Sequence, residues 1–260
     1  MKWLAGFGVE ELFYFQVDNV LARVLDPVFI GYHTLGSCGM SSKCVRKKNL
    51  EEKLGVFALV DGKPTVVEYS ELAYIESRLG KGSAALFTAG NIAIHVLNLA
   101  FAGRQAGAEE GEFPGGGGRR GKGSLPLHLA RKAIPHIDEK GRKVEPAQPN
   151  GYKFETFIFD ALRNAGAALI MESRREEEFS PLKNRSGDDS PATVLRDQLF
   201  LFSRWFEGAG IRVPREPGGL PLHKLEVSPL FALTAEEFTS RVPRDITVER
   251  DTYVGATCVE

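Results

Sequence analysis

The feature that most constrains this fold is an apolar and aromatic run near the start of the chain. The run Leu12 to Val17 is followed directly by Asp18 and Asn19. A short, almost continuously apolar segment is typical of a strand that is buried on both faces of a parallel sheet. Open α/β sheets bind ligands where such strands end, so Asp18 is a candidate ligand for Mg²⁺ or a nucleotide. Alternatively, Asp18 caps the helix expected near Asp26 and Pro27.

Composition argues against several classes of protein. The 260 residues carry a formal net charge of -1, which gives no electrostatic reason to expect binding to nucleic acid or to an anionic membrane. No segment approaches the roughly 18 apolar residues of a membrane span, and the apolar part of residues 1–8 is too short for a signal peptide. The cysteines, Cys38, Cys44 and Cys258, form no CxxC pair and fit a reducing compartment. We therefore expect a cytoplasmic protein.

Local signals predict an α/β chain of short elements. Pro27 is a favourable first helical residue and Gly36 a favourable end, so a helix is expected between them. Asp61 and Gly62 lie between two β-rich runs and predict a hairpin. Strands are expected at 12–17, 41–46, 55–60, 65–69, 84–88 and 167–171, helices at 92–101, 125–134, from 153 onward and from 190, and short β-like pieces at 225–227 and 246–248.

Composition also suggests how the chain is divided. Residues 102–124 turn to glycine and charge, and we expect a disordered surface insertion there. Within it, Gly116 to Lys122 matches the core of a phosphate-binding loop, but Gly123 replaces the required Ser or Thr and no strand precedes it, so we interpret the match as chance. The Pro-rich sequence beyond Ser190 predicts a small C-terminal α+β lobe at 190–260, after a main domain at 1–189.

Two groups of polar residues have simple structural explanations. The dense charges of 174–184 are typical of a solvated edge. The histidines show no metal-ligand spacing and are expected to be packing or surface residues; they are His33, His95, His128, His136 and His223.

Several blocks of sequence nevertheless resemble, in the same order, the eukaryotic UDP-N-acetylglucosamine pyrophosphorylases. The blocks are FQVDN at 15–19, DPVFIG at 26–31, VVEYSE at 66–71, AGNI at 89–92, PNGYKFE at 149–155 and REEEFSPLKN at 175–184, with EVSPL at 226–230 similar to the family's C-terminal segment. Six ordered blocks are far more specific than one short motif. The related UDP-glucose pyrophosphorylases carry different residues around the positions of Asp18 and Lys183.

This resemblance implies a Rossmann-like, GT-A-like nucleotidyltransferase with a mixed sheet. The implied uridylyltransferase joins UTP and N-acetylglucosamine 1-phosphate to give UDP-N-acetylglucosamine and pyrophosphate. Asp18 matches the family's aspartate at the nucleotide phosphates and Mg²⁺, and Lys153 and Lys183 match two lysines near the phosphates and the sugar. Glu68 and Tyr69 match its sugar-binding pair, and Asn91 matches its sugar-contacting asparagine. The implied catalytic residues are therefore Asp18, Lys153 and Lys183.

The main departure from the family lies at the front of the chain. The Gly-rich loop that grips the UTP phosphates, and the Gly-Asn-Gly-Gly segment near the uracil, are both missing; Thr88 also replaces a usual Asn. The chain therefore resembles an N-terminally truncated enzyme, the C-terminal half only, with little or no activity alone. An unpaired strand edge near Leu12 to Val17 would favour pairing with the missing N-terminal half.

Three interpretations stay open. The chain is a truncated uridylyltransferase, a natural short protein that binds a sugar nucleotide or a subunit without catalysis, or a pyrophosphorylase for another UDP-sugar such as UDP-N-acetylgalactosamine. Turnover with several sugar 1-phosphates would separate the last from the first, since one hydroxyl inversion shifts discrimination by only about 1 to 3 kcal/mol.

Overall fold

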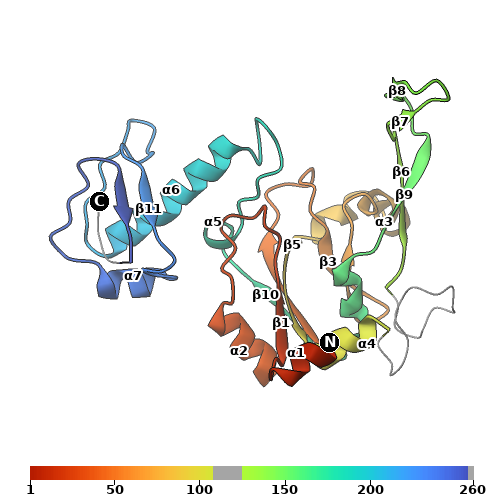
Figure 1. Cartoon of the computed structure of the whole chain (residues 1–260), viewed down its shortest axis with the longest axis horizontal. Coiled ribbons are helices and arrows are strands. Elements are labelled where there is room, and N and C mark those ends of the chain that lie inside the picture. The colour runs from red at the N-terminus through yellow and green to blue at the C-terminus, as the bar shows by residue number, and fades with distance from the viewer. Residues whose placement is uncertain (108–124, 257–260) are drawn as a thin grey trace.

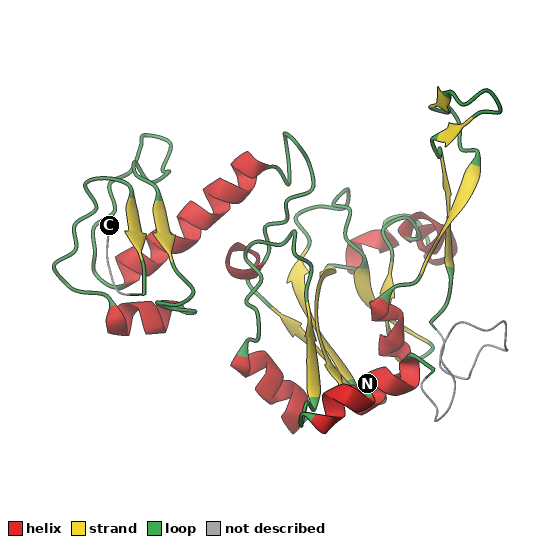
Figure 2. Ribbon diagram, in the orientation of Figure 1, coloured by secondary structure: helices red, strands yellow, loops and turns green. Residues whose placement is uncertain are grey.

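The computed structural model describes residues 1–107 and 125–256. Its main body is a six-stranded mixed sheet (Figures 1 and 2). The strands run in the order β10 (Ala168–Glu172), β2 (Met40–Arg46), β5 (Ala89–Asn98), β3 (Val56–Val60) and β4 (Lys63–Val67), with β1 (Glu11–Tyr14) also paired to β5. In this sheet β10 and β2 are parallel and the other pairs are antiparallel. The predicted mixed α/β sheet is confirmed.

Helices cover both faces of this sheet. On one face, Phe29 of α2 (Pro27–Leu35) packs in a buried cluster with Val45 and Ile94. On the other, Phe101 of α4 (Leu99–Gln105) and Leu162 of the 3-10 helix η2 (Ile158–Asn164) pack with strand residues. Other helices of the body include α1 (Lys2–Gly6), α3 (Leu72–Leu79) and the 3-10 helix η1 (Ser83–Leu86). Because helices cover both its faces, β2 is buried along almost its whole length.

The expectation that 12–17 forms a parallel strand buried on both faces is wrong. β1 is antiparallel to β5, with Phe13 opposite Val96, and its residues are only half-buried. Phe15 and Val17 lie beyond the strand, and Val17 is 92% exposed. An apolar run indicates burial but not the direction of the partner strand, which depends on a segment about eighty residues away. Among the described residues, no strand pairs with the outer edge of β1.

Two predicted helices are strands instead. Residues 92–101 were expected to be helical, but β5 continues to Asn98 and the helix begins only at Leu99. The reverse holds for the strand expected at 84–88, which is largely the 3-10 helix η1. The predicted helix at 125–134 is replaced by β6 (His128–Lys132), which pairs with β9 (Gly151–Glu155). The helix expected from Lys153 is reduced to η2. In β5, β6 and β9, pairing with a distant strand overrides a short helix-like pattern.

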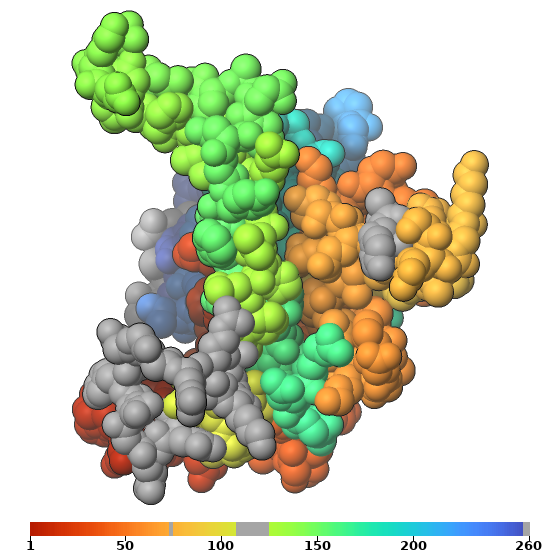
Figure 3. Space-filling model, turned by 90° about the vertical axis from the view of Figure 1, so that its right-hand side faces the viewer, coloured from red at the N-terminus to blue at the C-terminus, as the bar shows by residue number. Residues whose placement is uncertain are grey.

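The β6 and β9 strands form a narrow arm that extends from the body. The arm continues into a second short pair, β7 (His136–Ile137) and β8 (Lys143–Val144). Figures 1 and 3 show it projecting away from the sheet, in green. Its apolar side chains are largely open to solvent, as the 62% exposure of Phe154 illustrates.

The C-terminal part has a hydrophobic core of its own. Its buried residues, among them Phe206, Phe238 and Val254, lie within 206–254, and Leu199 and Phe202 pack against them. Its elements are α6 (Pro191–Gly208), β11 (Leu225–Val227), α7 (Ala235–Arg241) and β12 (Thr252–Val254). The predicted helix start is confirmed, since Ser190 and Thr193 form a capping box, but residues 246–248 form no strand. Of the predicted insertion at 102–124, residues 108–124 lie outside the described residues and 102–105 belong to α4.

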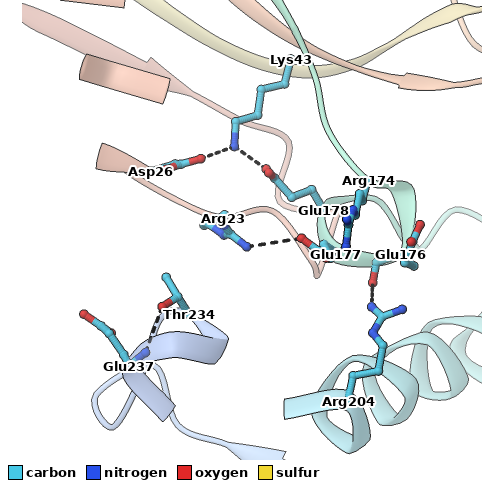
Figure 4. A network of polar contacts seen from close by, with 10 residues as sticks. All are labelled: Arg23, Asp26, Lys43, Arg174, Glu176, Glu177, Glu178, Arg204, Thr234 and Glu237. Carbon is cyan, nitrogen blue, oxygen red and sulfur yellow. Dashed lines mark hydrogen bonds and ion pairs between the residues drawn. The ribbon is translucent and has the colours of Figure 1, made fainter. Parts of the chain in front are cut away.

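A buried lysine ties three segments of the body together (Figure 4). Lys43, on β2, is fully buried, and its Nζ donates to Asp26 Oδ2 at 2.6 Å and to Glu178 Oε2 at 2.5 Å. Asp26 also caps α2, because its Oδ1 accepts a hydrogen bond from the Val28 N–H. The alternative in which Asp18 caps this helix is therefore wrong. Glu178 ends the short helix α5 (Arg175–Glu178), which contacts α6.

Removing the Lys43 charge should destabilise the fold strongly. Lys43→Met keeps much of the side-chain volume but leaves two buried carboxylates without their cation, so we expect the free energy of unfolding to fall by about 3 to 5 kcal/mol. Urea denaturation measures the change. Lys63→Met, at an exposed position of β4, is the control and should change stability by no more than about 0.5 kcal/mol. Equal stability of the two variants would contradict the assigned role of Lys43.

The same ion pair predicts a pH dependence. Burial opposes ionisation of Asp26, but the hydrogen bond and charge of Lys43 outweigh it and hold the pKa of the carboxyl below its ordinary 3.8. The ionised carboxylate therefore stabilises the folded chain above pH 3.8, and this contribution is lost as the pH falls toward the lowered pKa. We expect the stability difference between wild type and Asp26→Asn to shrink on acidification below about pH 4 in urea titrations. A difference that stayed constant would contradict this assignment.

Candidate functional site

A cavity of about 290 Å³ gathers side chains that are far apart in the sequence. Four of the residues implied by the resemblance line it; they are Glu68, Tyr69, Asn91 and Lys183. The two acceptor-rich side chains come from the sheet, since Glu68 follows β4 and Asn91 belongs to β5. Phe157 and Phe159 also line the cavity, and their stacked rings have centroids 4.8 Å apart. Residues of the sheet and of later segments thus build one site.

A bulge in β5 shapes one wall of the cavity. The pairing of β2 with β5 shifts between Ser42, which lies opposite His95, and Cys44, which lies opposite Asn91. Within the bulge Ala93 adopts a left-handed backbone conformation with φ of 55°, and its N–H donates to Asn91 Oδ1 at 3.0 Å. Bulges re-aim side chains beside functional sites. This one fixes the amide of Asn91 at the cavity wall.

The strained backbone at Ala93 gives a test of the bulge. A β-branched residue tolerates a positive φ poorly, so Ala93→Val should lower the free energy of unfolding by about 1 to 3 kcal/mol. Glycine adopts this conformation freely, so Ala93→Gly should be at least as stable as wild type. Chemical denaturation of the two variants compares them directly. If valine and glycine gave the same stability, the bulge conformation would be wrong.

Glu68 occupies an unfavourable electrostatic position. Burial, and next the charge of Glu71, raise the pKa of the Glu68 carboxyl. The Glu68 N–H also donates to Glu71 Oε2 at 3.1 Å. A carboxyl held in this way can accept hydrogen bonds from hydroxyl groups of a ligand, which would replace the water it has lost. Tyr69 is 46% exposed.

Asp18 lies beside the segment that carries Lys183. Its carbonyl oxygen accepts a hydrogen bond from the Leu182 N–H at 2.8 Å, and Asn19 forms a β-bridge with Pro181. Asp18 Oδ1 is buried and has no hydrogen-bond partner in the described part of the chain. An unsatisfied carboxylate oxygen is a suitable ligand for a hard cation such as Mg²⁺.

The structure does not bring Lys153 to the cavity. This residue lies on β9 in the arm, its side chain is 60% exposed, and its Nζ lies 2.6 Å from Glu155 Oε1. A different lysine, Lys53, lines the cavity together with Lys183. Two ammonium groups are thus at the cavity, although only one of them was expected there. Over residues 1–107 and 125–256, no group of three or more His, Cys, Asp or Glu side chains is arranged so that it could hold a metal ion.

The chain is similar in sequence to curated pyrophosphorylases. It is 38% identical over 244 residues to the UDP-N-acetylhexosamine pyrophosphorylase-like protein 1 of Mus musculus. The aligned region covers 88% of this chain and 46% of the relative. It is 34% identical to the UDP-N-acetylglucosamine pyrophosphorylase of Saccharomyces cerevisiae, over 78% of this chain and 41% of the relative. The chain belongs to the UDP-N-acetylglucosamine pyrophosphorylase family. It spans about half the length of the curated relatives it matches. No family model matches.

The fold of this pyrophosphorylase-family chain is also seen in solved structures. The uridine diphosphate N-acetylglucosamine pyrophosphorylase of Trypanosoma brucei, solved with an inhibitor, is similar with a TM-score of 0.71 and 27% identity, over 98% of this chain and 50% of that one. The sequence resemblance to the family is thereby confirmed.

None of the helices in 1–107 and 125–256 has the length and apolar character required to cross a membrane.

Sequence reasoning missed several residues that line this cavity. Phe157 and Phe159 lie in the segment that was expected to be helical from residue 153, and neither was expected at a site, although both line the cavity. His95 was expected to be a packing residue; it is fully buried, but it too lines the cavity. One signal could have indicated that His95 lies near the site: it follows the AGNI block closely, and the structure places it on the same strand as Asn91.

Proposed function

We propose that the cavity binds the sugar and phosphate groups of UDP-N-acetylglucosamine, and that the whole protein forms this compound from UTP and N-acetylglucosamine 1-phosphate. The convergence of Glu68, Asn91 and Lys183 on one cavity carries the proposal. A carboxylate, an amide and an ammonium group suit a ligand with hydroxyl, acetamido and phosphate groups. The name of the yeast relative supports the same substrate class.

The proposed reaction needs charge and positioning more than covalent chemistry. A phosphate oxygen of the sugar 1-phosphate bonds to the α-phosphorus of UTP, and the bond from that phosphorus to the leaving pyrophosphate breaks. Negative charge grows on the transferred group and the pyrophosphate, so ammonium groups held nearby lower the barrier. Lys183 and Lys53 line the cavity and are the residues proposed to provide this charge.

Asp18 is the residue proposed to hold a Mg²⁺ ion. When bound, the ion would neutralise phosphate charge and orient the phosphates. The buried, unpartnered Oδ1 of Asp18 supports this assignment. Magnesium usually binds through one or two carboxylates together with substrate phosphates, so a single protein carboxylate is enough.

We further infer that the body is a Rossmann-like, GT-A-like nucleotidyltransferase domain. In this domain Lys153 would reach the phosphates only after the β6–β9 arm moves. In the present structure Lys153 pairs with Glu155. This placement favours a second candidate function, which is binding of a sugar nucleotide without turnover by the 260-residue chain. Release of pyrophosphate from UTP and N-acetylglucosamine 1-phosphate distinguishes the two: we expect binding with little or no product, and turnover at ordinary enzymatic rates would disprove this.

The sugar itself is proposed at the level of the N-acetylhexosamines. The mouse relative is named for that class, which contains both N-acetylglucosamine and N-acetylgalactosamine. Comparing the affinities of the two UDP-sugars would separate them. A difference of more than about 10-fold, or about 1.4 kcal/mol, would establish a preference.

The role of Lys183 can be tested by ligand binding. Loss of a hydrogen bond between an ammonium group and a phosphate costs about 1.5 to 3 kcal/mol, so Lys183→Ala should weaken binding of UDP-N-acetylglucosamine about 10- to 100-fold in isothermal titration calorimetry. Lys63→Ala, at an exposed lysine of β4 away from the cavity, is the control. Asp18→Ala should abolish any dependence of the affinity on Mg²⁺. If the affinity of Lys183→Ala were unchanged, the proposed role of Lys183 would be wrong, and residues 174–184 would be only a solvated edge.

A further inference from the structure

Two buried histidines on opposite sides of β2 differ in one respect. His33, on α2, uses both ring nitrogens: Nδ1 lies 2.7 Å from Ser41 Oγ and Nε2 lies 2.9 Å from Glu11 Oε2. His95, on β5, has the same first contact, with Nδ1 2.8 Å from Ser42 Oγ. Its Nε2 is buried without a partner among the described residues. Both imidazoles are fully buried.

The unpartnered nitrogen belongs to a residue of the cavity wall. His95 lines the cavity with Asn91 and Lys183, and the bulge in β5 lies between His95 and Asn91. Tyr14 stacks on the imidazole, with ring centroids 5.6 Å apart and an angle of 25° between the planes. A buried polar group without a hydrogen bond is costly. The ring is held by Ser42 and Tyr14 and lines the cavity, so a ligand in the cavity is the candidate partner for Nε2.

The contact with Ser42 decides which nitrogen carries the proton. Ser42 is fully buried, and within the described structure the one recorded partner of its hydroxyl is His95 Nδ1. If the hydroxyl donates to Nδ1, its proton is satisfied, and the ring proton then resides on Nε2. Burial lowers the pKa of His95 to about 3, so the ring is neutral near pH 7. In this tautomer His95 offers an uncharged N–H donor at Nε2.

We propose that His95 Nε2–H donates a hydrogen bond to an oxygen of the sugar-phosphate ligand, and that Ser42 positions it by fixing the tautomer. This inference rests on the proposed function of the same cavity. An acetamido carbonyl, a sugar hydroxyl and a phosphate oxygen share the required chemistry, since each is an oxygen acceptor. A neutral donor here adds direction to a site whose charge is provided by the lysines.

Nuclear magnetic resonance of the unmodified 260-residue chain, with ¹⁵N-labelled histidine, tests the tautomer and the contact. We expect His95 to be protonated on Nε2, and its Nε2 and Nε2–H signals to shift when UDP-N-acetylglucosamine is added to saturation. His33, whose ring nitrogens are both occupied, is the internal control and should not respond. A proton on Nδ1 of His95, or unchanged His95 signals at saturation, would overturn the proposal.

Two substitutions test the energetic contribution. His95→Asn can keep a polar atom near the Nδ1 position for Ser42 but cannot reach the cavity, whereas His95→Gln can place an N–H near the Nε2 position. We expect Asn to weaken binding about 5- to 20-fold, as loss of one hydrogen bond implies, and Gln to recover most of the affinity. His33→Asn controls for general destabilisation and should leave the affinity of the folded protein unchanged. Equal affinities of wild type and His95→Asn would contradict the proposal.

Three ligands identify the oxygen and separate the two levels of inference. A His95→Asn effect on UDP-N-acetylglucosamine alone points to the acetamido carbonyl. An effect that extends to UDP-glucose points to a hydroxyl, and one that extends to UDP points to phosphate. Binding with no His95 effect for any ligand overturns only the role of His95. Failure of the wild-type chain to bind any of the three overturns both this inference and the proposed function.

Discussion

A single buried cation holds together the segments from which the site is built. Lys43 Nζ contacts Asp26 at the start of α2 and Glu178 at the end of α5. Asn19 joins the same region, since its Nδ2 donates to the Glu178 carbonyl and its Oδ1 accepts from the Ser180 N–H. Because a buried charge is tolerated only when it is paired, this arrangement fixes the chain on either side. The segments of Asp18 and Lys183 leave this point together and remain hydrogen-bonded.

The sheet contributes the other half of the site through an irregularity. A regular β5 would alternate its side chains between the two faces without interruption. The bulge around Ala93 breaks that alternation beside the cavity, where the consecutive residues Asn91, Ile92 and Ala93 all line it. On the same strand, the His95 imidazole is hydrogen-bonded at Nδ1 and has no partner at Nε2 among the described residues. The strained backbone at Ala93 is thus part of what holds the Asn91 amide at the cavity wall.

Local signals predicted the elements whose formation depends on neighbouring residues. The helix after Pro27, the Asp61-Gly62 hairpin and the capped helix after Ser190 all form as expected, because proline geometry, turn chemistry and capping act over a few residues. The predictions failed where strand pairing over long distances decides. β6 forms only against β9, and β5 exceeds the short apolar pattern that suggested a helix.

The sequence by itself determined the family and most of the chemical groups of the site, because those depend on residue identity and order. Glu68, Tyr69, Asn91 and Lys183 were all expected, and the structure brings them to one cavity. Only the tertiary structure decided which other groups join them. It places Lys53 and His95 at the cavity and leaves Lys153 on the arm. The path of the loop before β3 places Lys53, and strand pairing places His95 and Lys153; neither can be read from spacing along the chain.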